Sequence, residues 1–269
     1  MSKAFDSHVH LDTGDGDLVV AEILALQTVD RMALQSVGEA DWDLVLRLAD
    51  ALPTVAPGLG IHPWSAPALR GDDTAWLDRL RTLLLLHPAA FVGEIGLDKV
   101  ATFAETGVVE FSKQQSVFAA QFQLAAELRR PVSVHCVHAH GHLIELLRTS
   151  KAAALPPSIA LHSFSGKPAV VHEYLRAAGS KTLVFFGFSA VICMRAEERS
   201  RAAIACVPDD RILVETDVGE TKRVDELMRS IVDVVSQVKQ WTREQTALLT
   251  RQNAIRWISP PKNDENKEA

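Results

Sequence analysis

The sequence is poor in cysteine and has no long apolar segment. Its three cysteines, Cys136, Cys193 and Cys206, show no CxxC spacing, which argues against a disulfide framework or a zinc ribbon and favours a reducing compartment. The longest apolar run, "TLVFFGFSAVICM" from Thr182, is shorter than the roughly 18 residues of a membrane-spanning helix. The opening "MSKAFDSH" lacks the apolar core of a signal peptide. We therefore expect an intracellular protein, cytoplasmic or nuclear, without a membrane-spanning segment.

Basic residues do not predominate either. The chain has 28 Lys and Arg against 34 Asp and Glu, a formal net charge of -6, which argues against a protein whose affinity comes mainly from neutralising phosphates. A local basic groove remains compatible with this charge. The motifs GxGxxG after a strand, GxxxxGK[ST] and GxSxG are also missing. Dinucleotide-binding, P-loop and serine-hydrolase functions therefore lack their required residues.

Short β-rich segments alternate along the chain with longer segments of helical periodicity. Most are continuous runs of Val, Ile, Leu and Phe, which is typical of parallel strands covered on both faces. This rhythm predicts an α/β fold, a TIM (β/α)8 barrel. The second strand and the helix in "DGDLVVAEILALQ" are the least clearly marked. The expected strands are Ala4–His10, Met32–Val37, Thr54–Gly60, Phe91–Leu97, Val132–Cys136, Ile159–Phe164, Thr182–Ser189 and Ile212–Thr216.

The domain organisation should be simple. A chain of 269 residues can bury one large core, and neither a repeat nor an interdomain linker is visible. We expect a single barrel domain over residues 1–259. Residues 260–269, "PPKNDENKEA", are charged and begin with two prolines, so we predict a disordered tail.

Potential metal ligands stand at or near the ends of the expected strands. His8 and His10 in "DSHVHLD" lie two residues apart and would point to the same side of a strand. Because a TIM barrel gathers its active site where the strands end, we expect four histidines and two carboxylates to meet at one rim. These residues are His8, His10, Glu94, His135, His162 and Asp217.

Such a set suffices for two divalent ions that share a bridging group. Two ions about 3.5–4 Å apart can clamp the attacking and leaving oxygens of a hydrolytic reaction and lower the pKa of a water. Glu94 is the candidate bridge, and Asp217 could hold one metal while taking the proton from the water. Mixed nitrogen and oxygen ligands suit Zn, Mn or Co, and Mg is also compatible. Taken singly, each of these residues could instead be a core histidine or a helix cap.

Several motifs together carry a family resemblance. In chain order they are "DSHVHLD", "GLGIHPW", "VGEIGLD", "FAAQFQLAAELRRPVSVHC", "LHSFSG" and "LVETD". From Phe5 to about Asp217 the chain resembles the TatD family of metal-dependent hydrolases in the amidohydrolase superfamily, with a weaker echo in "TRQNAIRWI". The resemblance implies a TIM barrel, a binuclear site at the six positions and deoxyribonuclease activity, typically from the 3′ end. DNA or another phosphodiester is then the expected partner.

The substrate contacts are less well defined than the metal ligands. His62 matches a family histidine that we assign to the substrate phosphate, although Pro63 and Trp64 could simply order it in its loop. Family members usually have an arginine where this chain has Val137, and a proline-containing segment where it reads "ETDVGE". We assign His138 to substrate binding because the loop after the fifth strand should face the site. If a helix began near His138, a third ion could join His138 and His142, but a solvated helix start is favoured.

Two further functions remain open. The same activated water could attack an amide or carboxylic ester, as in other amidohydrolases, or the barrel could be retained as a partner in a protein complex. A monomer is favoured.

Overall fold

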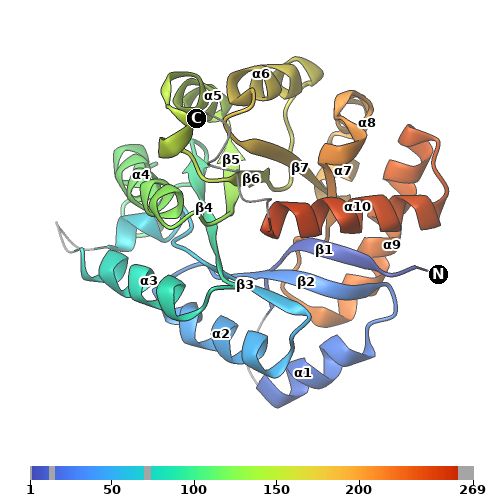
Figure 1. Ribbon diagram of the computed structural model, residues 1–269, viewed down its shortest axis with the longest axis horizontal. Helices are drawn as coiled ribbons and strands as arrows, with labels where there is room; N and C mark the ends of the chain where they lie inside the picture. The colour runs from blue at the N-terminus through green and yellow to red at the C-terminus, as the bar shows by residue number, and fades with distance from the viewer. Residues whose placement is uncertain (1, 12–15, 70–73, 260–269) are drawn as a thin grey trace, which may run out of the picture.

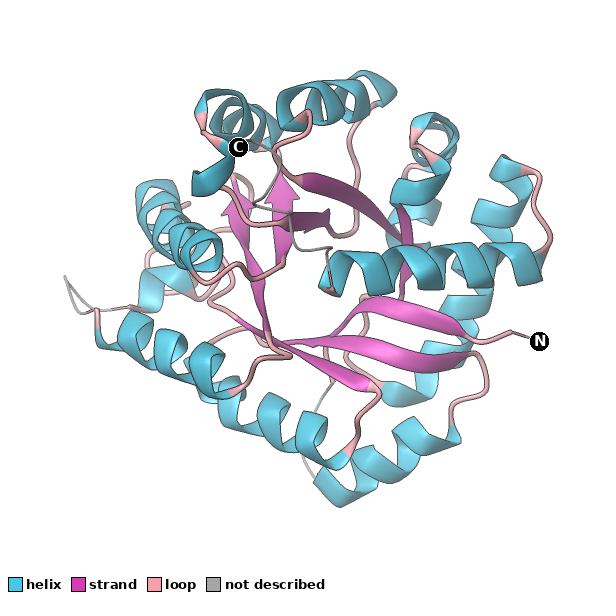
Figure 2. Ribbon diagram, viewed as in Figure 1, coloured by secondary structure: helices cyan, strands magenta, loops and turns pink. Residues whose placement is uncertain are grey.

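Eight parallel strands form the centre of the computed structural model, which describes residues 2–11, 16–69 and 74–259 (Figures 1 and 2). Neighbours in the sheet are neighbours in the chain, from β1 to β8, and each adjacent pair is parallel. This confirms the predicted α/β barrel. The strands are β1 (Ala4–Val9), β2 (Val29–Gln35), β3 (Val55–Leu59), β4 (Phe91–Asp98), β5 (Val132–Val137), β6 (Ser158–Leu161), β7 (Leu183–Ser189) and β8 (Ile212–Glu215).

Helices surround the strands (Figure 2). They are α1 (Gly16–Ala25), α2 (Trp42–Ala51), α3 (Ala75–Leu86), α4 (Phe111–Glu127), α5 (His140–Thr149), α6 (Pro168–Ala178), α7 (Ala190–Arg195), α8 (Glu197–Cys206), α9 (Val224–Lys239) and α10 (Arg243–Ile258). Strand β2 begins at Val29, earlier than the predicted Met32, because Val29 pairs with Ala4 at the start of β1. None of the described helices combines the length and apolarity needed to cross a membrane.

The first and last strands meet along a hydrogen-bonded seam. The backbone N–H of Asp217 donates to the carbonyl of His8 at 2.9 Å, and that of His10 donates to Val218 at 3.1 Å. The buried carboxylate of Asp6 accepts the backbone N–H of Thr216 at 3.0 Å and also the Thr216 hydroxyl at 2.5 Å. The seam therefore brings the first and last strands of the barrel together at the C-terminal end of β1.

Helix α10 fills the opposite mouth of the barrel. Its residues Ala254 and Trp257 belong to one apolar cluster with strand residues that point into the barrel, namely Phe5, Ala33, Phe91, Ala160, Phe185 and Leu213. The indole N–H of Trp257 donates to the carbonyl of Val132 at 3.1 Å, and the Ser158 hydroxyl donates to the carbonyl of Trp257 at 2.6 Å. Figure 1 shows α10 lying alongside β1. The mouth at the other ends of the strands is left for the functional site.

The described part of the chain ends at residue 259. The predicted tail, residues 260–269, lies outside the described residues. That residues 1–259 form one domain stays our proposal.

Candidate metal centre

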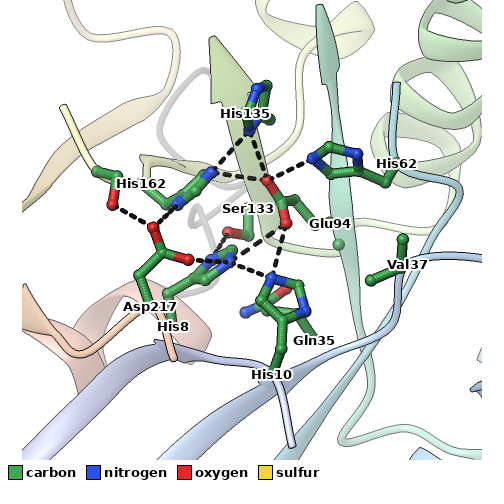
Figure 3. A network of polar contacts seen from close by, with 12 residues as sticks. His8, His10, Gln35, Val37, His62, Glu94, Ser133, His135, His162 and Asp217 are labelled. Carbon is green, nitrogen blue, oxygen red and sulfur yellow. Dashed lines mark hydrogen bonds and ion pairs between the residues drawn. The ribbon is translucent and has the colours of Figure 1, made fainter. Parts of the chain in front are cut away.

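Glu94 lies at the centre of a group of histidines (Figure 3). It is a buried residue of β4. Its Oε2 atom is 3.3 Å from Nε2 of His8 and 3.0 Å from Nε2 of His10. The two rings come from β1 and the residue after it, and their Nε2 atoms are 3.0 Å apart. One carboxylate oxygen thus faces the histidine pair at the end of β1.

The second oxygen of Glu94 faces histidines from three other strand ends. Oε1 is 2.6 Å from Nε2 of His162, 3.0 Å from Nδ1 of His135 and 3.2 Å from Nε2 of His62. His135 lies on β5, His162 directly follows β6, and His62 follows β3. The carboxylate therefore stands between two sets of imidazoles, which is the position expected of a bridging ligand.

Asp217 closes the group from the end of β8. Its Oδ1 is 4.0 Å from Nε2 of His8, and its Oδ2 is 4.0 Å from Nδ1 of His162. The Ser163 hydroxyl donates to Oδ2 at 2.7 Å. Asp217 has φ of 51°, a left-handed conformation that is uncommon outside glycine but several-fold enriched for Asp. All six predicted ligands are thus brought together.

Three overlapping sets of side chains have ligand atoms within 4.8 Å of one another and could hold a metal ion. They are His8, His10 and Asp217; His8, Glu94 and His162; and His62, Glu94 and His135. Two buried ring nitrogens, Nδ1 of His10 and Nδ1 of His162, have no hydrogen-bond partner within the described residues. A donor set of imidazoles and carboxylates suits a divalent transition metal.

His62 and His8 differ in the hydrogen bond made by Nδ1, the ring nitrogen that does not contact Glu94. Nδ1 of His62 accepts the backbone N–H of Trp64 at 3.1 Å, so in the neutral ring Nε2 carries the proton. His62 therefore donates toward Glu94 and has no free lone pair for a metal, although it lies within one of the three sets. Nδ1 of His8 is 3.1 Å from the Ser133 hydroxyl, which can accept and so leave Nε2 of His8 unprotonated.

The electrostatics of the group favour a bound cation. Burial by itself raises the pKa of Glu94, but His162, His62 and His8 lower it more, to well below its usual range. Burial and neighbouring His162 lower the pKa of His8 to about 3, which keeps the ring neutral, as metal ligation requires. Burial also lowers the pKa of His162, yet Glu94 and Asp217 raise it to about 10. The carboxylates thus draw positive charge into the site.

Among the six predicted ligands, His10 and Asp217 have the most exposed side chains. The side chains of His10 and Asp217 are 25% and 26% exposed, whereas those of His8 and Glu94 are 0% and 1% exposed. His10 and Asp217 are therefore the ligand-type side chains that solvent reaches most readily. Asp217 is the acidic member of the predicted ligand set that can contact a molecule arriving from outside.

Asp98 was not singled out by the sequence analysis, although it closes β4 in "GEIGLD". Its Oδ2 lies 3.2 Å from Nε2 of His135 and accepts the indole N–H of Trp64 at 2.9 Å. Burial raises the pKa of Asp98, but the hydrogen bonds from His135 and Trp64 lower it more, so the group is ionised. A carboxylate at a strand end was the available signal, since strand ends build the site.

Glu215 is a second buried carboxylate that the sequence analysis passed over. It lies in β8, accepts the Ser7 hydroxyl at 3.0 Å and also accepts the backbone N–H of Ser163. Burial raises its pKa to about 8. Glu215 thus links the seam between β8 and β1 to the loop that carries His162.

The histidines after β5 are less closely connected to the centre. His138 is exposed, with φ of 53°. Within the described residues it makes no hydrogen bond or ion pair with Glu94. Helix α5 begins at His140, so His138 and His142 do not share a helix face. The ring of His142 instead lies 5.2 Å from that of Phe111. Val137, in place of the family arginine, ends β5 and accepts the backbone N–H of Lys99.

Comparison with known proteins agrees with this architecture. A family model described as TatD related DNase matches residues 5–259. The chain is 26% identical to Cut9-interacting protein scn1 of Schizosaccharomyces pombe, over 91% of this chain and 96% of that one. It is 32% identical to the 3′-5′ ssDNA/RNA exonuclease TatD of Musicola paradisiaca, over 79% and 77%. The crystal structure of a TatD homologue from Escherichia coli has the same fold, with a TM-score of 0.79, 22% identity and coverage of 97% and 99%.

Proposed function

The chain belongs to the TatD related DNase family of metal-dependent hydrolases, and from that premise we propose that it cleaves phosphodiester bonds of DNA with a two-ion centre. The proposed ligands are His8, His10, Glu94, His135, His162 and Asp217. Zn, Mn, Co and Mg are the candidate ions. The observation that carries the proposal is the position of Glu94, whose two buried oxygens face the two separate histidine sets.

Bound divalent ions would supply Lewis acidity and a water whose pKa is lowered toward neutrality. The protein's own groups then divide the remaining work. Asp217 reaches solvent and has Oδ2 oriented by the Ser163 hydroxyl, so its carboxylate can accept the proton that the attacking water loses. Burial raises the pKa of Asp217, but His162 and His8 lower it more, so the group is a carboxylate before the reaction begins.

His62 fits the substrate role that its family match suggests. Its Nε2 carries a proton because Nδ1 accepts the Trp64 backbone N–H. A neutral N–H donor beside the centre can bind a non-bridging phosphoryl oxygen and stabilise the charge that develops there. We also propose that His138 contacts substrate, from an exposed position on the loop after β5. Because Val137 stands where family members usually have an arginine, we propose these two histidines as its replacements in substrate binding.

Two further properties are proposed with the activity. The free cysteines, Cys136, Cys193 and Cys206, favour a reducing intracellular location, cytoplasmic or nuclear. A monomer is the favoured state. Cell fractionation and light scattering would test the location and the state in turn.

A non-catalytic role in a protein complex is the second candidate function. One observation favours it: a relative that covers nearly the whole chain is named an interacting protein. Against it stands the complete set of ligand-type side chains around a buried glutamate, for which a scaffold has no evident use. The two functions predict different effects of replacing Glu94 on activity and on the cellular role.

The test combines metal analysis with an activity panel. Purified protein is assayed for bound metal and for hydrolysis of single-stranded DNA, a phosphomonoester and acyl substrates, before and after chelation. We expect chelator-sensitive release of nucleotides from DNA, and a loss of about 100-fold or more in Glu94→Gln. The matched control is Glu145→Gln, at an exposed glutamate of α5. Turnover of acyl substrates without nuclease activity would favour the amidohydrolase alternative, and an unaltered cellular role in Glu94→Gln would favour the scaffold.

A further inference from the structure

Trp64 is an exposed residue that lies beside the proposed metal centre. The side chain is 57% exposed, yet its ring lies 4.8 Å from that of His62 at an interplanar angle of 82° and 5.9 Å from that of His135 at 72°. Trp42 and Trp257, in contrast, are fully buried. An aromatic ring of this size, open to solvent and in edge contact with two site histidines, contributes only part of its surface to the core.

The Trp64 ring is also held in place. Its Nε1–H donates to Oδ2 of Asp98 at 2.9 Å, and its backbone N–H donates to His62. The other oxygen of Asp98 accepts the backbone N–H groups of Val100 and Ala101 at 2.7 and 3.0 Å. One buried carboxylate therefore fixes the indole and the loop after β4 together. A ring whose orientation is already fixed loses little conformational entropy when a ligand packs on it.

We propose that the exposed face of Trp64 stacks on an unpaired nucleobase of the substrate and so makes the proposed nuclease selective for single strands. The proposal rests on the proposed function, because the phosphodiester must reach the group around Glu94 beside it. Every nucleobase offers a flat π face when it is unpaired, and stacking on tryptophan tolerates any base. In a duplex those faces are covered by neighbouring bases.

The charge of the molecule gives this contact added weight. With a formal net charge of -6, the protein has no overall excess of positive charge to hold a polyanion. Stacking supplies affinity that does not depend on neutralising phosphates.

The first experiment compares Trp64→Ala and Trp64→Phe with the wild type on two single-stranded DNA substrates. One has natural bases, and the other has abasic sugars at its 3′-terminal nucleotides. We expect Trp64→Ala to lower kcat/KM on the natural strand by about 5- to 100-fold, mainly through KM. Trp64→Phe keeps an aromatic face and should retain most of the activity. On the abasic strand, wild type and Trp64→Ala should be alike. An equal loss on both strands would overturn the proposal, because Trp64 would then act through His62 or Asp98.

The second experiment separates this proposal from the proposed function. Binding of a single strand that carries a fluorescent base analogue at its 3′ end is measured in chelator, where cleavage is absent. Stacking predicts quenching of the analogue by wild type and Trp64→Phe, and its loss in Trp64→Ala. Quenching without any cleavage on metal addition would contradict only the nuclease function. Cleavage with unchanged quenching and unchanged KM in Trp64→Ala would contradict only the stacking.

Discussion

His62 differs from His8 in the ring nitrogen that carries its proton. The Trp64 backbone N–H donates to Nδ1, which leaves Nε2–H pointing at Oε1 of Glu94. Proximity alone would group His62 with the metal ligands. The hydrogen bond indicates instead that Nε2 of His62 is an N–H donor, and on that ground we propose its contact with substrate.

This distinction predicts that His62→Ala lowers kcat on DNA by about 100-fold while the bound metal per chain stays unchanged. Metal content by mass spectrometry and single-turnover kinetics would measure the two effects separately. His10→Ala is the contrasting variant, because we expect it to lose metal. Loss of an ion in His62→Ala would show that His62 is a ligand.

Asp98 acts on the centre through His135. A carboxylate that binds the far nitrogen of a ligating histidine fixes the ring's tautomer and orientation, and its loss typically weakens metal binding by about 10- to 100-fold. We predict a weakening of that size in Asp98→Asn, measured by competition with a chromophoric chelator. Asp43→Asn, at an exposed aspartate of α2 that pairs with Arg79, is the control and should bind metal normally. Equal affinities in both variants would contradict this role for Asp98.

At the scale of elements, α10 belongs to the core although its sequence gives a weak helical pattern. Trp257 is fully buried and bonds the carbonyl of Val132 at the start of β5. We predict that Trp257→Ala lowers the free energy of unfolding by about 3–5 kcal/mol, as measured in urea. Metal stoichiometry of the folded protein should stay unchanged, because α10 closes the mouth opposite the centre. A stability within about 0.5 kcal/mol of wild type would mean that α10 does not plug the barrel.

The turn that enters β2 depends on one carboxylate of α9. Asp225 accepts the backbone N–H and hydroxyl of Thr28 at 2.8 and 2.6 Å, and the backbone N–H of Gln27 at 3.0 Å. Burial raises the pKa of Asp225, but these hydrogen bonds lower it more, to below its usual value. Because the pKa is lower in the folded state, the stabilisation is present above the unfolded pKa of about 4 and is lost as pH falls through the folded value.

We therefore expect wild type to exceed Asp225→Asn in unfolding free energy by about 1 kcal/mol near neutral pH, after allowance for solvent screening. The difference should shrink toward about pH 3. Urea unfolding in chelator, across that range, would measure it without a contribution from metal. A difference that does not change with pH would contradict the assignment to the charged carboxylate.

The elements were largely predictable from the sequence, and their connections were less so. Buried parallel strands are marked by continuous apolar runs such as "LVFFGFS" in β7. The early start of β2 was missed because "VDRM" mixes charged and apolar residues, and its place is set by pairing with Ala4. The plugging role of α10 was also missed, because contacts between Trp257 and the strand interiors are long-range and leave no local periodicity.

At the scale of the whole molecule, the centre joins residues that are far apart in sequence. The seam places Asp217 against His8, and closing the barrel brings Glu94, His135 and His162 to the same rim. The convergence was predictable because every strand of a parallel barrel ends at one face. Loop conformations decide which side chains contact each oxygen of Glu94, and they also set the contacts that Asp98 makes with His135 and Trp64. No sequence motif indicates these conformations.

Metal binding should therefore stabilise the entire barrel. An ion that binds only the folded state adds about 4 kcal/mol at a concentration 1,000 times its Kd, and without it the carboxylates around Glu94 lose their counter-charge. We predict a clear fall in Tm on chelation, reversed by adding back a divalent ion. In Glu94→Gln the same treatment should shift Tm much less. A wild-type Tm that chelation does not change would argue against a resident metal.

The central claim is that two cations bind on either side of Glu94. Anomalous diffraction from crystals grown with Mn or Zn tests it most directly. The account predicts two anomalous peaks, one beside His8, His10 and Asp217 and the other beside His135 and His162, with Glu94 between them. A peak bound by His62, or the absence of any peak next to Glu94 at saturating metal, would contradict it.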